Sequence, residues 1–250
     1  MKLVIVTGQK GGVGKTLTAQ VLATWLRRRN VNWRGADTDQ ENKFFADVNR
    51  QNVRAYTLYD RSGRLVTTAI NAFIDAIGEA LDDGVDVFVV DMGAGQLQTL
   101  MGALRETAVL DEVGKSVGLT VAYVLVDDVE SLSTLHNNQA ALDGLAAQWV
   151  VVKNLRDGPL TLYETSEALR PEMQRRNALE MQLPALEDRD VLQSFKLTGL
   201  TLEAFADPAS QQPWSQRGRL KTWLNSALAQ LDALADAWLP APAPTRIRRV

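Results

Sequence analysis

The chain alternates short apolar runs with longer amphipathic segments. Residues 3–6 are Leu-Val-Ile-Val, a run rich in β-branched residues that predicts a buried strand. Further apolar runs at 85–91, 119–126 and 149–154 predict strands of the same kind. Apolar strands that alternate with helices are typical of a parallel sheet covered on both faces. The pattern therefore predicts an α/β fold, doubly wound, with a mainly parallel sheet and helices on both faces.

Apolar residues at helical spacing occupy the segments between these strands. The predicted helices start at Leu17 and cover 65–81, 97–113, 159–176 (with a break or a new start at Pro171) and 214–239. Weaker patterns predict further strands at 31–36, 53–59 and 178–184. We expect one domain over residues 1–239, followed by a flexible tail rich in Pro and Arg at 240–250.

A glycine-rich loop follows the first predicted strand and leads directly into the first predicted helix. Residues 8–16 read Gly-Gln-Lys-Gly-Gly-Val-Gly-Lys-Thr. Backbone N–H groups can wrap a phosphate chain only where no Cβ blocks the approach, and a following helix adds the positive end of its dipole. This order of elements is the context that a P-loop requires. The expected nucleotide-binding residues are Gly11, Gly12, Val13, Gly14, Lys15, Thr16 and Leu17.

The heptapeptide at 10–16, Lys-Gly-Gly-Val-Gly-Lys-Thr, resembles the deviant Walker A motif of the ParA/MinD family of P-loop ATPases. Gln9 resembles the ParA branch. In that family the extra lysine, here Lys10, reaches the nucleotide of the other subunit in a dimer. The resemblance implies ATP as the ligand and catalytic roles for Lys10 and Lys15, which would stabilise the charge of phosphoryl transfer. Thr16 would bind Mg²⁺ through its hydroxyl.

Two carboxylates follow the weak strand at 31–36. The two carboxylates of Asp37-Thr38-Asp39-Gln40, spaced by one residue, resemble those of the Asp-x-Asp-x-Gln segment of ParA proteins, which usually has a Pro at or beside the position of Gln40. The resemblance implies that Asp37 supports the magnesium shell and that Asp39 is catalytic, because a nearby carboxylate can orient the attacking water. An acidic turn is the alternative interpretation, since Asp favours turns.

A third carboxylate, Asp91, ends the apolar run at 85–91 and has the pattern of a Walker B aspartate. In a parallel sheet it would emerge beside the P-loop and hold Mg²⁺ through water. The small residues 92–95 that follow differ from the Pro-rich continuation common in ParA proteins. We expect them to form a second switch that offers a backbone N–H to the γ-phosphate.

The resemblance also implies a pair of residues that bind the base. In the ParA/MinD family an Asn at the end of the strand at 149–154 reads adenine, and a carboxamide offers the donor and acceptor that this needs. Asn154 is the candidate here, and a turn-forming Asn is the alternative. Residues 178–184 resemble the last strand and the Pro-containing turn beside the base, which makes Pro184 the second candidate. Asp127 and Asp128 are expected to cap a helix rather than to bind a metal.

Composition narrows the class of protein further. The 250 residues are 46% apolar and 23% charged, which argues against disorder, and the net charge of −3 argues against a uniformly basic nucleic-acid binder. The absence of cysteine excludes disulfides, thiolate zinc sites and cysteine-ligated iron–sulfur clusters. No apolar run approaches the length of a membrane span. We expect a cytoplasmic protein without a stable membrane anchor.

The resemblance implies an ATP- and Mg²⁺-dependent switch with weak ATPase activity. It would form a homodimer with ATP, bind DNA non-specifically in that state, and partition or position DNA or protein cargo with an unidentified stimulating partner or cargo adaptor. Candidate DNA contacts are Arg217, Arg219, Lys221, Arg246, Arg248 and Arg249. Two alternatives stay open: a P-loop synthetase of the dethiobiotin-synthetase type, and a MinD-like membrane-positioning ATPase. A phosphorylated small-molecule product would favour the first, and co-sedimentation with liposomes the second.

Overall fold

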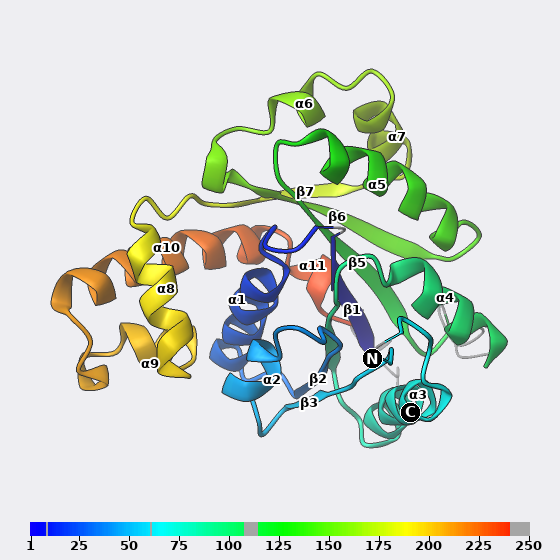
Figure 1. Cartoon of the computed structure of the whole chain (residues 1–250), viewed down its shortest axis with the longest axis horizontal. Helices are drawn as coiled ribbons and strands as arrows, with labels where there is room; N and C mark the ends of the chain where they lie inside the picture. The colour runs from blue at the N-terminus through cyan, green and yellow to red at the C-terminus, as the bar shows by residue number, and fades with distance from the viewer. Residues whose placement is uncertain (9, 61, 108–114, 241–250) are drawn as a thin grey trace, which may run out of the picture.

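The computed structural model describes residues 1–8, 10–60, 62–107 and 115–240. Its centre is a parallel sheet of seven strands in the order β3-β2-β4-β1-β5-β6-β7, with helices on both faces (Figure 1). The predicted doubly wound α/β fold is therefore confirmed. The strands are β1 (Lys2–Thr7), β2 (Trp33–Asp37), β3 (Val53–Ala55), β4 (Val87–Asp91), β5 (Gly118–Leu125), β6 (Ala147–Asn154) and β7 (Leu179–Leu183).

The helices form two layers, one on each face of the sheet. One layer holds α1 (Lys15–Arg28), α2 (Phe44–Val48), α8 (Arg189–Thr198), α9 (Leu202–Ala206), α10 (Trp214–Ala233) and α11 (Ala235–Trp238). The other layer holds α3 (Thr67–Asp82), α4 (Leu97–Glu106), α5 (Val129–Gln139), α6 (Thr161–Glu164) and α7 (Leu169–Arg175). No helix of the described residues is both long enough and apolar enough to cross a bilayer.

Strand β1 shows why the apolar runs are continuous rather than alternating. Successive side chains of a strand point to opposite faces. Val4 and Val6 therefore belong to the core under α1 and α10, whereas Leu3 and Ile5 belong to the core under α3 and α4. Because both faces of the sheet are covered, both sets of positions must be apolar.

Several predicted boundaries move in the structure. The strand predicted at 53–59 ends at Ala55, because its only neighbour β2 ends at the paired residue Asp37. The helix predicted at 214–239 is broken at Leu234 into α10 and α11. Pro171 lies in the first turn of α7, where its missing N–H costs no helical hydrogen bond.

Some predictions fall outside the described residues. They concern Gln9, residues 108–113 of the helix predicted at 97–113, and the tail, where the structure describes nothing after residue 240. The three tail arginines proposed for DNA contact, Arg246, Arg248 and Arg249, belong to this part of the chain.

The connectivity of the sheet determines where a site can form. Strand β1 lies between β4 and β5. The strands β2 to β4 lie on one side of it and β5 to β7 on the other, so the order of the strands along the chain reverses at β1. In open α/β sheets, ligands bind outside the carboxyl ends of the strands at such a switch point. The glycine-rich loop at 8–14 follows β1 at this edge, and the ends of β2 and β4 lie beside it.

Candidate functional site

Two residues of the loop between β1 and α1, Gly12 and Gly14, have backbone conformations that only glycine adopts without strain. Gly12 has φ of 77° and Gly14 has φ of 106°, both in the left-handed region. A Cβ on Gly14 would also lie 2.6 Å from Nδ2 of Asn154. The loop ends at the N-terminus of α1, where the first backbone N–H groups have no helical partner. These features make the loop an anion cradle.

A buried cation lies inside this cradle. Lys15 is only 5% exposed, and its Nζ donates to the carbonyl oxygen of Lys10 at 2.9 Å. Burial lowers the pKa of the Lys15 ammonium, while the negative charges of Asp91 and Asp39 oppose that shift. A bound phosphate oxygen would be a stronger acceptor for this ammonium than the loop carbonyl is.

The register between β2 and β4 places Asp37 opposite Asp91 at the ends of the two strands. Oδ1 of Asp37 accepts from the backbone N–H of Asp39 at 3.1 Å, and Oδ2 accepts from that of Ala46 at 3.0 Å. Burial nevertheless raises the pKa of Asp37 to about 6 against these bonds. Asp37 therefore holds the loop after β2 in place and adds buried negative charge beside Asp91.

Asp91 is fully buried, and neither of its carboxylate oxygens has a hydrogen-bond partner. Burial and the charge of Asp37 raise its pKa well above the usual range. The Thr16 hydroxyl and the Lys15 ammonium both act to lower the pKa of Asp91. The hydroxyl is near the carboxylate but does not form a hydrogen bond of standard geometry with it. A buried carboxylate without a partner is costly, so Asp91 is suited to hold a cation or a water molecule bound to one.

The donor set suits magnesium rather than a metal held only by protein. Within the described ranges, no three His, Cys, Asp or Glu side chains form a cluster that could hold a metal. Magnesium keeps several waters and binds through one or two carboxylates plus substrate phosphates. Thr16, Asp37 and Asp91, the residues predicted for the metal, meet at the carboxyl edge of the sheet beside the cradle.

Asp39 lines the cavity in front of the loop, but its carboxylate is folded back onto its own segment. Its Oδ1 accepts from the backbone N–H groups of Glu41 at 3.0 Å and Asn42 at 3.1 Å. The preceding Thr38 is fully buried and bonds to the side chain of Gln96. Sequence reasoning missed Thr38 because it is the unspecified position between the two carboxylates of its motif, and missed Gln96 because it belongs to no motif.

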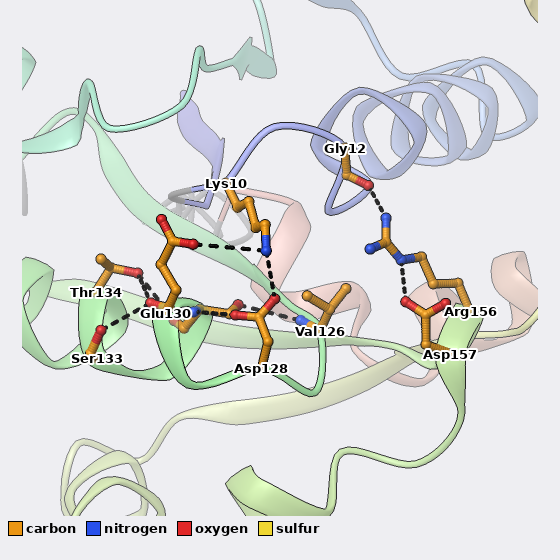
Figure 2. Close-up of polar contacts among 10 residues, drawn as sticks. Lys10, Gly12, Val126, Asp128, Glu130, Ser133, Thr134, Arg156 and Asp157 are labelled. Atoms are coloured by element: carbon orange, nitrogen blue, oxygen red, sulfur yellow. Dashed lines mark hydrogen bonds and ion pairs between the residues drawn. The ribbon is translucent and has the colours of Figure 1, made fainter.

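Lys10 points to the start of α5 in the same chain (Figure 2). Its Nζ lies 3.5 Å from Oδ2 of Asp128 and 3.8 Å from Oε2 of Glu130, and the Lys10 side chain is 48% exposed. Asp128 also accepts from the N–H of Ser131 at 2.6 Å, which confirms the predicted helix cap. The lysine therefore has two partners within its own chain.

Asn154 supports the loop from the end of β6. Its Nδ2 donates to the carbonyl oxygen of Val13 at 2.7 Å, and its Oδ1 accepts from the N–H of Arg156 at 3.1 Å. The Arg156 guanidinium bonds to the carbonyl oxygen of Gly12 and to Asp157 (Figure 2). Arg156, like Thr38 and Gln96, is a residue that the sequence did not single out. Contact between Asn154 and adenine stays a prediction.

A cavity of about 700 Å³ opens beside the loop. Its far wall is largely apolar and includes Pro184, which accepts from Nε1 of Trp223 at 2.7 Å. The volume lies within the range of small-molecule sites. The cavity is lined at its two ends by residues that include Gly14, Lys15, Thr16, Asp39, Pro184 and Trp223. Phosphate-binding groups at one end and an apolar wall at the other match the two ends of a nucleotide.

Comparison with known proteins agrees with this geometry. Among solved structures, the MinC:MinD cell division protein complex of Aquifex aeolicus aligns with 15% identity over 97% of this chain and 99% of the other, with a TM-score of 0.59. The cell division ATPase MinD of Pyrococcus furiosus aligns with 16% identity over 93% and 99%, at 0.52. The septum site-determining protein MinD of Pyrococcus horikoshii, complexed with Mg-ADP, aligns with 17% identity over 94% and 98%, at 0.52.

Identities this low show a shared fold alone, and no curated protein matches the sequence. The family comparison is more specific. The model described as the CobQ/CobB/MinD/ParA nucleotide binding domain matches residues 4–184, which span the loop, all three carboxylates and the end of β7. With the anion cradle and the unpartnered carboxylate on the same sheet edge, the conclusion is that the chain belongs to the CobQ/CobB/MinD/ParA nucleotide-binding family.

Proposed function

We propose that this protein is a ParA-like switch that dimerises with ATP and is released by ATP hydrolysis. The observation that carries the proposal is Asp91, a buried carboxylate without a partner beside a Gly-Lys-Thr loop. A related fold in Pyrococcus horikoshii MinD is complexed with Mg-ADP, which supports the choice of ligand.

Each site residue has a role in this proposal. The backbone N–H groups of residues 11–17 and the Lys15 ammonium hold the phosphates, while Thr16, Asp37 and Asp91 hold Mg²⁺ directly or through water. Magnesium, when bound, neutralises charge on the phosphate oxygens. Pro184 and the apolar wall enclose the base, with Asn154 as the candidate to read it.

Asp39 is the proposed catalytic carboxylate. In the described conformation its Oδ1 is occupied by two backbone N–H groups, so it acts on water through its second oxygen or after the loop rearranges. A carboxylate there accepts a hydrogen bond from water and orients it toward the phosphate. We expect Asp39→Ala to bind ATP but to hydrolyse it far more slowly.

Dimerisation gives Lys10 its proposed role. To reach the nucleotide of a second copy, Lys10 must leave Asp128 and Glu130, which hold it within its own chain. Both ion pairs are exposed and therefore weak enough to exchange. Lys10→Ala is expected to lose hydrolysis and to keep nucleotide affinity.

For the cargo, the proposal is a protein or DNA whose binding follows the nucleotide state. Of the basic side chains named for DNA contact, Arg219 forms an ion pair with Asp188. Arg217 donates to the carbonyl oxygen of Asp207. The Aquifex aeolicus relative forms a complex with MinC, which supports a protein adaptor. Binding of DNA across a salt series with ATP, ADP and no nucleotide separates the two kinds of cargo.

The decisive experiment is light scattering after size exclusion, with ATP, ADP or no nucleotide, together with phosphate release. The proposal expects a monomer without ATP, a transient dimer with ATP, and a persistent dimer for Asp39→Ala. Wild-type and Asp39→Ala proteins that both stay monomeric with Mg²⁺ and ATP would refute the switch. A phosphorylated small molecule in place of free phosphate would indicate a synthetase instead.

A further inference from the structure

We propose that Gln96 is a positioning residue for ATP hydrolysis. Its carboxamide joins the segment that carries Asp39 to the loop after β4, so that the two move as one unit. This inference rests on the proposed function, because it concerns the rate of the same reaction. It assigns a role to a residue outside the P-loop and outside the carboxylate set.

The contact between the two segments is formed by Thr38 and Gln96. The Thr38 hydroxyl donates to Oε1 of Gln96 at 3.0 Å, and Nε2 of Gln96 lies 3.4 Å from the carbonyl oxygen of Thr38. The carboxamide thus engages both the side chain and the backbone of one residue. Such a two-point contact fixes orientation as well as position.

The loop after β4 contributes to the same contact. The backbone N–H of Gly93 donates to the Thr38 hydroxyl at 3.3 Å, and the N–H of Thr38 donates to the carbonyl oxygen of Asp91 at 2.9 Å. A Cβ on Gly93 would overlap the Gln96 carboxamide. The space that Gly93 leaves is therefore the space that the Gln96 side chain occupies.

Thr38 matters because it lies between the two carboxylates of its segment. Asp37 is fixed by β2, and Asp39 is the first residue able to reach the cavity. Thr38 is fully buried, so its contacts with Gln96 and Gly93 set the direction in which Asp39 leaves the sheet. An attacking water must be held in line with the leaving group, and a shift of about 1 Å costs on the order of 100-fold in rate.

The test compares kcat, KM, ADP affinity and hydrogen exchange in matched variants. Gln96→Ala removes both contacts, Thr38→Val removes the hydroxyl at constant shape, and Thr38→Ser keeps the hydroxyl. Gln98→Ala is the control, since Gln98 lies two residues after Gln96, in the first turn of α4, and donates to the carbonyl oxygen of Asn137 instead.

The expected result is a fall in kcat of about 10- to 100-fold for Gln96→Ala and Thr38→Val. ADP affinity and KM should change less than about threefold. The double variant should be no slower than the slower of the two single variants, because each single variant already disrupts the same contact between Thr38 and Gln96. Thr38→Ser should recover most of the rate, and Gln98→Ala should match wild type.

Hydrogen exchange tests whether the two segments move as one unit, and it does so without a measurement of ATP hydrolysis. In Gln96→Ala, amide exchange should accelerate at 37–42 and 92–96 together, with no change in Gln98→Ala. Unchanged kcat in Gln96→Ala, or faster exchange in only one of the two segments, would overturn the inference. A wild type that does not hydrolyse ATP would instead refute the proposed function, and the exchange measurement would still test the link between the segments.

Discussion

At the scale of single residues, the site concentrates buried charge that the protein itself does not neutralise. Asp91 has no hydrogen-bond partner, and Asp37 lies opposite it on the neighbouring strand. Lys15 is the nearby cation, and its own burial disfavours its charged form. Buried charges of this kind lower the stability of the folded protein, and a bound ligand of opposite charge would offset that loss.

The first prediction concerns Asp91→Asn without magnesium. A carboxyl whose pKa is raised by burial stabilises the fold at low pH, and this contribution is lost as the pH rises. Asparagine does not titrate, so the variant should become progressively more stable than wild type as the pH rises above about 4, the ordinary pKa of an aspartate carboxyl. Thermal unfolding in EDTA measures this difference. In Mg²⁺ with ADP the order should reverse, and a variant less stable than wild type at pH 8 in EDTA would contradict the argument.

The second prediction concerns Gly14→Ala. Its φ of 106° and the approach of Asn154 to 2.6 Å leave no room for a Cβ. The left-handed backbone alone costs about 1–3 kcal/mol for a residue other than glycine. We expect a destabilised protein without measurable nucleotide binding. Gly218→Ala is the control, since Gly218 lies within α10 with no atom near its Cβ position, and it should gain about 0.5–1 kcal/mol. Equal nucleotide affinity in both variants would count against the cradle.

The functional roles of some site residues can be predicted from the sequence, and those of others cannot. The Gly-Lys-Thr segment and Asp91 are predictable because the chemistry fixes both their type and their spacing. Gln96 and Arg156 are not, because a side-chain amide or guanidinium can bond to any nearby carbonyl. Asn154 shows the same limit, since its type was noted but not its contact with Val13.

At the scale of elements, the N-terminus of α5 lies beside the P-loop and holds Lys10. Asp128 has two functions there, as the helix cap and as a partner of the lysine. Asparagine caps a helix as well as aspartate does. Asp128→Asn therefore removes the charge that faces Lys10 and keeps the helix start.

The third prediction combines Asp128→Asn with Glu130→Gln. Without these charges Lys10 is freed from its own chain, and self-association with ATP should strengthen. Each exposed ion pair contributes about 0.2–1 kcal/mol, so the two pairs together contribute about 0.4–2 kcal/mol. The dimer dissociation constant should therefore fall by about 2- to 30-fold for each chain that releases its lysine. Sedimentation velocity measures it, and the effect should vanish at about 1 M salt.

The control for this experiment is Asp127→Asn. Asp127 accepts from the backbone N–H of Leu162 at 2.8 Å and forms no ion pair with Lys10 in the described structure. It should leave self-association unchanged. A higher dimer dissociation constant in the double variant would contradict the prediction. It would mean that Asp128 and Glu130 stabilise the dimer instead of holding Lys10 within its own chain.

Elements were predicted best where burial decides their pattern. The central strands β1, β4, β5 and β6 were identified because both of their faces are covered. At the edge of the sheet, β3 is shorter than its alternation predicts because β2 offers it only three partners. A break such as that at Leu234 depends on tertiary packing, and the helical spacing alone gives no sign of it.

At the scale of the whole molecule, the cavity joins parts of the chain that are far apart in sequence. The loop after β1, the segment after β2 and the region from Pro184 to Trp223 all contribute to its wall. A ligand that contacts all three should stabilise the fold as a unit.

The fourth prediction is a rise in melting temperature with Mg²⁺ and ADP. At a ligand concentration of about 100 times the dissociation constant the gain is about 2.7 kcal/mol, or about 5–10 °C for a chain of this length. Removal of Mg²⁺ with EDTA should reduce the shift. Lys15→Ala should abolish it, and an unchanged shift in that variant would place the nucleotide elsewhere.

The fold was predictable at this scale because apolar strands alternate with amphipathic helices along the chain. The ligand class was predictable because the Gly-Lys-Thr loop is a phosphate-binding motif. The cargo was not, since the described basic side chains named for DNA contact, Arg217, Arg219 and Lys221, form a short basic stretch of α10 that fits an ion pair within the protein as well as a contact with DNA. The acidic partner of Arg219, Asp188, is far from it in sequence and becomes visible only in three dimensions.

The indole of Trp223 lies in the cavity wall, and its N–H bonds to the backbone beside Pro184. An adenine ring entering there would change the surroundings of this fluorophore. Titration of unlabelled nucleotide should therefore alter the intrinsic emission of the protein, and Trp223→Phe should remove most of that signal. The molecule carries its own optical reporter of occupancy.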